Sequence, residues 1–100
     1  MAADALIING EDNVATAIRD IRAEEEVRVA VGTSEKVVMV KEPIPYGHKF
    51  AVRDIDKGEH IIKYGEVMGR ATRAIGSGYH AHIQNIESLR GRGDWTAKDK

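Results

Sequence analysis

Two histidines and a glutamine are spaced two residues apart near the C-terminal end of the sequence. His80, His82 and Gln84 alternate with Ala81 and Ile83. This alternation predicts a strand that carries the three polar side chains on one face, with neighbours roughly 6–7 Å apart. Imidazoles and an amide at that spacing can bind a metal ion or hydrogen-bond an oxygen-rich ligand. The solvated outer face of an ordinary strand gives the same pattern, so both interpretations stay open.

A second pair of candidate groups, His48 and Lys49, follows the turn-forming sequence Pro45-Tyr46-Gly47. The pair could receive a carboxylate, with the Lys49 ammonium group as its charge partner. Lys49 would act as a base only if burial lowered its pKa. The start of a simple hairpin explains the pair as well. The sequence contains no phosphate-binding loop and no nucleophile elbow.

Composition restricts the class of protein. One hundred residues make one small domain, with 42% hydrophobic and 31% charged residues. A net charge of -1 and only 5% aromatic residues disfavour nucleic-acid binding. No apolar run reaches the roughly 20 residues of a membrane span, and the N-terminus does not resemble a signal peptide, so we expect a cytoplasmic protein. Without cysteine, a metal site must use imidazole, carboxylate or amide groups.

The elements that must position the candidate groups are mostly strands. Residues 5–9 form a short apolar run, and Val14, Ala17, Ile18 and Ile21 have helical spacing, which predicts a helix over residues 11–22 capped by Asp12 or Asn13. Further strands are predicted over residues 27–31, 36–41, 48–53, 60–64 and 67–75, before the histidine strand. We therefore expect a mostly β domain with one short helix near the N-terminus.

A local pattern recurs along the chain. Segments 17–25, 51–59 and 71–79 align without gaps, and each reaches an isoleucine (Ile21, Ile55 or Ile75) before a short turn and an extended stretch. The copies are unequally spaced, which excludes a solenoid. We expect each isoleucine to anchor its turn to the core, and His60 and His80 to occupy equivalent places after two of these turns.

Five motifs give the chain a specific resemblance to a known family. They lie at residues 12–17, 44–51, 63–65, 69–73 and 80–94. In this order they resemble the altronate/galactarate dehydratase family, at its N-terminal SAF-type domain, which also occurs as a separate small subunit. The resemblance implies a β-clip fold of short strands with one short helix. It divides the chain into a SAF-like domain over residues 1–89 and a flexible tail over residues 90–100 that leads toward a large catalytic subunit.

The resemblance also implies a chemistry. Family members remove water from an aldonic or aldaric acid, such as altronate or galactarate, to give a 2-keto-3-deoxy acid. A close relative, the small subunit of sulfolactate sulfo-lyase, serves in the elimination of sulfite instead. The family implies a divalent metal, iron(II) or manganese(II), held mainly by the partner subunit. The partners implied are this large subunit and a small sugar acid, with no nucleic acid and no membrane.

Roles for individual residues follow from the resemblance. Gln84 stands where the family pattern has a second histidine, so its part in metal binding differs from that pattern. We expect catalysis by His48 and His82, substrate contacts from Lys49, His80, Gln84 and Asn85, metal ligation by His80 and His82, and docking of the partner by Arg90, Arg92 and Asp94.

Other functions remain open. The chain is expected to be inactive alone if it is a lyase subunit. A stand-alone binding module for polyhydroxy acids would need only the histidine face. A structural or regulatory subunit would bind the large subunit without using the histidines, and self-association into a homo-oligomer is compatible with each of these functions.

Overall fold

The computed structural model describes residues 3–88, which fold into short strands without a helix. Within that range no helix is long and apolar enough to span a membrane. The strands are β1 (Ala5–Ile7), β2 (Val14–Ala17), β3 (Glu25–Val31), β4 (Ser34–Val40), β5 (Lys49–Ala51), β6 (His60–Lys63), β7 (Glu66–Ala71), β8 (His80–Ala81) and β9 (Ile86–Ser88). The expectation of a mostly β domain is confirmed.

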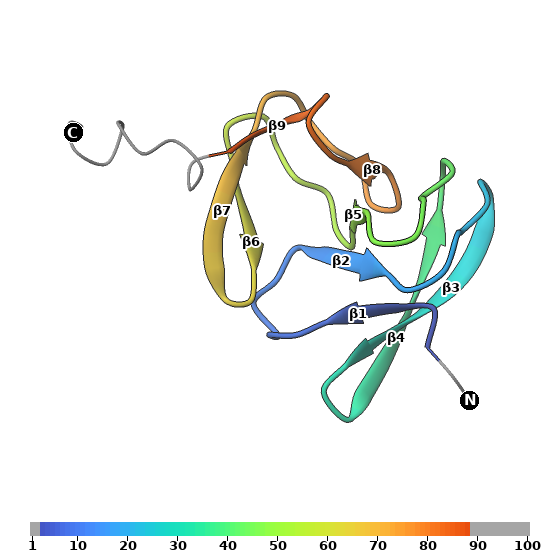
Figure 1. The fold of residues 1–100 in the computed structure, drawn as a ribbon. Helices are drawn as coiled ribbons and strands as arrows, with labels where there is room; N and C mark the ends of the chain where they lie inside the picture. The colour runs from blue at the N-terminus through green and yellow to red at the C-terminus, as the bar shows by residue number, and fades with distance from the viewer. Residues whose placement is uncertain (1–2, 89–100) are drawn as a thin grey trace.

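The strands form two sheets that meet near the start of β2. Six strands pair in the order β4-β3-β1-β2-β5-β8, and three pair in the order β6-β7-β9. Figure 1 shows the larger sheet curling from the β3–β4 hairpin toward β8, with β6 and β7 on the opposite side of the molecule. Asn13 joins the sheets, because its backbone N–H donates to the carbonyl of Ile62 and its side-chain amide donates to the carbonyl of His60.

Two apolar clusters make the core. One lies along the larger sheet and includes the alternating residues Val27 and Val29 of β3 and the fully buried Phe50 of β5. The other lies where the two sheets meet and includes Ile61 of β6 and Ala81 of β8. The residues that carry the candidate chemistry flank this second cluster, so its packing positions them.

A recurring turn organises both halves of the domain. Backbone hydrogen bonds pair Ile21 with Ile44 and Ile55 with Ile75 in both directions. All four isoleucines are at most 3% exposed, so each anchors its turn to the core as the repeated segments predicted. The structure adds a fourth copy at Ile44, where Pro43 and Pro45 flank the isoleucine and hide its likeness to the other three segments.

The prediction of a helix over residues 11–22 is wrong. Val14 to Ala17 form β2, which pairs with β1 on one side and with β5 on the other. Ala15 is not among the residues that the helical spacing would bury, yet it is fully buried. The reason is that a central strand is covered on both faces. Pairing with strands distant in sequence outweighs the local spacing of Val14, Ala17 and Ile18.

The expected helix caps also have another role. The carboxylate of Asp12 accepts hydrogen bonds from the backbone N–H groups of Asn9, Tyr64 and Gly65. The side-chain oxygen of Asn13 accepts from the N–H of Ile62. Both side chains are buried and hold the β6–β7 hairpin against the larger sheet.

Candidate functional site

Three of the four histidines lie together on one side of the β5–β8 pair. Lys49 pairs with Ala81 and Phe50 with His80 in antiparallel register. Extending this register by one residue brings His48, just before β5, opposite His82, just after β8. Side chains that face one another across such a pair lie close together, and diagonal neighbours such as His48 and His80 remain within reach. The register of two short strands therefore assembles the site.

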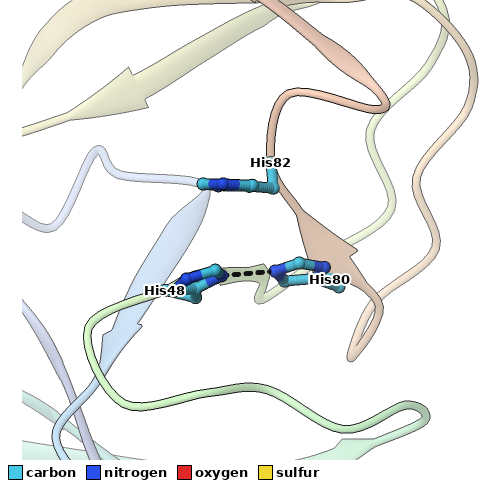
Figure 2. A group of neighbouring side chains, drawn as sticks. All are labelled: His48, His80 and His82. Carbon is cyan, nitrogen blue, oxygen red and sulfur yellow. Dashed lines mark hydrogen bonds between the residues drawn. The ribbon is translucent and has the colours of Figure 1, made fainter.

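The three imidazoles form a stack. Ring centroids are separated by 4.4 Å for His48 and His82, 5.1 Å for His48 and His80, and 5.4 Å for His80 and His82. The rings are inclined to one another by only 16–25°. Figure 2 shows the hydrogen bond that joins Nδ1 of His48 to Nε2 of His80, at 2.9 Å, with the His82 ring lying over the pair. We name these three residues the histidine cluster.

Gln84 extends the hydrogen bonds of the histidine cluster. Its side-chain Nε2 lies 3.3 Å from Nδ1 of His80, whose Nε2 bonds Nδ1 of His48. Which nitrogen donates in each contact depends on the tautomers of the two rings. In either direction Nδ1 of His48 is engaged with His80, so a ligand would be met by Nε2 of His48.

Asn85 fixes the backbone that carries His80 and His82. Its side-chain oxygen accepts from the N–H of His82 at 2.9 Å, and its side-chain nitrogen donates to the carbonyl of His80 at 2.8 Å. The side chain is 7% exposed and lies under the turn rather than on its surface. The buried amide therefore connects both histidine positions and sets the spacing between their side chains.

The surroundings of His80 and His82 lower the pKa of both imidazoles. Burial is the main cause that lowers the pKa of His80, and repulsion by His48 and His82 lowers it further. Burial also lowers the pKa of His82, with additional repulsion from His48 and Lys49. Glu42 counteracts part of this effect at His80, whose backbone N–H donates to the Glu42 carboxylate. A neutral imidazole has a free lone pair, which both a proton acceptor and a metal ligand require.

A hollow of about 290 Å³ adjoins His82, between β5 and the smaller sheet. Lys49 and Lys63 line it together with His82 and mainly apolar side chains. Burial lowers the pKa of Lys49, and repulsion by Lys63 lowers it further. From the sequence, we expected Lys49 to act as a base only if burial lowered its pKa. In the structure, burial does lower the pKa of Lys49.

The histidine cluster fits a metal ion by its donor set. One ring nitrogen from each of His48, His80 and His82 lies within 4.8 Å of the other two. Ligands about 2.0–2.1 Å from one ion lie roughly 3.0–3.5 Å apart, and the stacked rings would have to rotate to direct their lone pairs at one ion. Imidazole suits iron(II) better than manganese(II), which favours oxygen ligands. Binding would replace the proton between His48 and His80.

The structure brings together most of the residues selected from the sequence. His48, Lys49, His80, His82, Gln84 and Asn85 all belong to or border the histidine cluster, while Arg90, Arg92 and Asp94 lie outside the described residues. The expected alternation is wrong beyond Ala81, because residues 82–85 form a turn. As a consequence, Ile83 is 84% exposed instead of facing the core.

Sequence analysis missed two residues of the site. Lys63 begins the family motif at residues 63–65, which could have selected it, whereas Glu42 belongs to no motif and comes from a segment distant in sequence. It also treated His48 and His80 as separate candidates. The signal that could have joined them was the register of β5 and β8, which two- and three-residue strands do not reveal without the structure.

Comparison with known proteins identifies the domain. Residues 3–89 match the altronate/galactarate dehydratase SAF domain. The chain is 40% identical to altronate dehydratase of Escherichia coli (strain K12) over 81 residues, which are 81% of this chain and 16% of the relative. It is 43% identical to (2R)-sulfolactate sulfo-lyase subunit alpha of Chromohalobacter salexigens over 51 residues, which are 51% of this chain and 54% of that subunit.

A third relative covers a comparable part of the chain. Galactarate dehydratase (L-threo-forming) of Escherichia coli (strain K12) is 39% identical over 71 residues, which are 71% of this chain and 13% of the relative. The chain thus spans less than a fifth of the dehydratases that it matches and about half of the Chromohalobacter subunit. The match over residues 3–89 shows that the chain belongs to the altronate/galactarate dehydratase SAF domain family.

Proposed function

We propose that this chain is the small subunit of a sugar-acid lyase, in which it dehydrates an aldonic or aldaric acid together with a larger catalytic chain. One observation carries the proposal: His48, His80 and His82 are stacked and hydrogen-bonded on one side of a domain whose relatives are dehydratases and a sulfo-lyase subunit. Imidazoles are suited to move the protons that an elimination requires.

The reaction needs two proton transfers. A base removes the proton from the carbon next to the carboxylate, and the bond between the neighbouring carbon and its hydroxyl breaks as an acid protonates the leaving oxygen. Water and an enol result, and the enol converts to the 2-keto-3-deoxy acid. His82 is the proposed base, because burial lowers its pKa and it faces the hollow beside Lys49.

His48 is the proposed acid. Nδ1 of His48 is engaged with Nε2 of His80, so Nε2 of His48 is the nitrogen that can donate to the leaving hydroxyl. His48 donates as an imidazolium that has taken a proton from solvent, and loss of the Nε2 proton leaves a neutral ring whose Nδ1–H donates to Nε2 of His80. In this account His80 and Gln84 act through His48, and Asn85 positions both histidines of the turn.

A divalent metal ion bound at the site would polarise the carboxylate and the neighbouring hydroxyl of the acid. Its main ligands are proposed to come from the larger chain. A second possibility is favoured by the close approach of three ring nitrogens, within 4.8 Å of one another: the histidine cluster itself holds iron(II). Titration of this chain alone with ferrous ion separates the two, because only the second predicts binding that His80→Gln abolishes.

The test of the proposed function is a lyase assay with this chain alone, with a candidate large chain alone, and with both. Aldonic and aldaric acids are supplied with iron(II) or manganese(II), and 2-keto-3-deoxy acid is measured; sulfolactate is included with sulfite as the measured product. Turnover that requires both chains supports a catalytic small subunit. Sulfite release without dehydration would assign the sulfo-lyase reaction instead.

Two further outcomes would contradict the proposal. Association of the two chains, with turnover that is indifferent to substitutions in the histidine cluster, would identify a structural or regulatory subunit. Tight binding of a polyhydroxy acid by this chain alone, without turnover in any mixture, would identify a stand-alone binding module. Size measurement of the purified chain in solution also shows whether it forms a homo-oligomer.

A further inference from the structure

The hollow beside His82 combines two ammonium groups with an apolar floor. Lys49 reaches it from β5 and Lys63 from the end of β6, while Ile61, Met68 and Ile86 line its base. Its volume of about 290 Å³ is near the lower limit of small-molecule sites. The strands on its two sides belong to different sheets, so the hollow is a product of how the sheets pack.

Lys49 and Lys63 are close enough to repel one another. Repulsion by Lys63 is the second cause, after burial, that disfavours the charged form of Lys49, and Tyr64 opposes it. The Lys63 ammonium group itself lies 4.7 Å from the centre of the Tyr64 ring. An anion between the two ammonium groups would replace repulsion with attraction in a partly desolvated site.

We propose that this hollow binds a carboxylate, with Lys49 and Lys63 as its two cationic contacts and His82 beside the carbon that bears it. The inference deepens the proposed function, because it states which end of the acid enters the domain. His82 lines the hollow and stacks on His48 at 4.4 Å, so an acid anchored by the lysines extends along the histidine cluster.

The lining also limits the class of anion. A carboxylate leaves its carbon skeleton to contact Ile61, Met68 and Ile86, and apolar surface buried there contributes to binding. Inorganic phosphate would bury further oxygens against the same apolar floor without hydrogen-bond partners, which costs free energy. We therefore expect the hollow to prefer a small carboxylic acid to inorganic phosphate.

An NMR titration of the full chain tests the inference without turnover. Lactate is added at constant ionic strength, and the side-chain resonances of Lys49, Lys63 and His82 are followed. We expect saturable shifts for all three, and an affinity at least tenfold weaker in Lys49→Met. Lys57→Met is the matched control, because Lys57 is exposed in the turn between Asp56 and Gly58, and it should bind lactate like the wild type.

Three results would overturn the inference: no saturable shift with lactate, equal affinity in Lys49→Met and the wild type, or equal affinity for phosphate and lactate. Lys63→Met provides a second variant if Lys49→Met does not fold. The titration uses this chain alone, so saturable lactate binding together with no lyase turnover in any mixture with a candidate large chain would retain the carboxylate site and reject the proposed function.

Discussion

The histidine cluster shows how much at the level of single residues is visible in a sequence. His80, His82 and Gln84 were recognisable by their spacing, and His48 by its neighbours. Their geometry was not, because the stack depends on which residues of β5 and β8 face each other. Gln84, which the resemblance places where a histidine was expected, contacts the cluster through a hydrogen bond to His80.

Asn85 gives a prediction at the same scale. Asn85→Ala leaves the N–H of His82 and the carbonyl of His80 without their side-chain partners, so we expect a loss of about 1–3 kcal/mol in the free energy of unfolding. Urea denaturation measures it. Gln84→Ala is the control, because this neighbour is exposed and should change stability by less than about 0.5 kcal/mol.

The histidine resonances provide a second readout for the same pair of variants. Loss of the Asn85 amide should shift the ring signals of both His80 and His82, because it connects their backbone groups. Loss of the Gln84 amide should act on His80 first, through its Nδ1. Equal stability of the two variants would contradict the positioning role of Asn85.

At the scale of elements, the recurring turn was predictable and the N-terminal helix was not. An isoleucine followed by a turn is a local pattern, and each copy uses its isoleucine in the same way. Residues 11–22 have a helical period as well, but Asn13 hydrogen-bonds β6 and Val14 pairs with Ala51. These partners are more than thirty residues away, and no local pattern reveals them.

Two glycines of the recurring turn give a matched comparison. Gly58 and Gly78 both have a φ of 88°, where a side chain costs roughly 1–2 kcal/mol. A Cβ at Gly58 meets nothing within 4 Å, whereas a Cβ at Gly78 would lie 2.0 Å from the backbone oxygen of Met39. Gly58→Ala should therefore lower the free energy of unfolding only by this conformational cost.

Gly78→Ala should lower the free energy of unfolding by about 1–3 kcal/mol more than Gly58→Ala does, because the backbone must move to relieve the overlap. The affected contact joins the end of β4 to the turn before β8, where the N–H of Lys41 donates to the carbonyl of Gly78. Thermal unfolding of the two variants measures the difference. Equal melting temperatures would show that the close approach of Gly78 to Met39 does not constrain the fold.

At the scale of the whole domain, an ion-pair network holds the N-terminal segment to β3. Arg19 bonds Asp4 at 2.9 Å and Glu25 at 2.5 Å, and Asp4 also accepts from the backbone N–H of Arg28. The bond from Arg28 is the main cause that lowers the pKa of Asp4, and the bond from Arg19 is the main cause that lowers the pKa of Glu25.

This network predicts the dependence of stability on pH. Carboxyl groups whose pKa is lowered by folding stabilise the native state above their unfolded pKa of about 4, and the contribution is lost as the pH falls through the folded value. Arg19→Met should be less stable than the wild type at pH 7, and the difference should shrink below about pH 4. Urea denaturation at several pH values measures both.

Arg53→Met is the control for this experiment. Arg53 forms a single surface pair with Glu59 at 2.9 Å, and its side chain is 51% exposed. An isolated exposed pair contributes about 0–1 kcal/mol, so its loss should change the pH profile less than the loss of Arg19. An unchanged difference between Arg19→Met and the wild type from pH 7 to pH 3 would contradict the network.

The domain is also part of a larger functional unit in the proposed account. The dehydratases that it resembles are more than five times as long as the matched region, and the sulfo-lyase relative is named as a subunit. In the proposed account the hollow of about 290 Å³ beside the histidine cluster faces the larger chain, and the reaction takes place between the two.

The most direct test of this account compares two histidine substitutions in the reconstituted lyase. His82→Gln removes the proposed base, whereas His60→Gln changes an exposed histidine that lies outside the histidine cluster. We predict that His82→Gln lowers kcat at least about 100-fold while His60→Gln leaves it near the wild-type value. Equal turnover by the two variants would contradict a catalytic role for the histidine cluster.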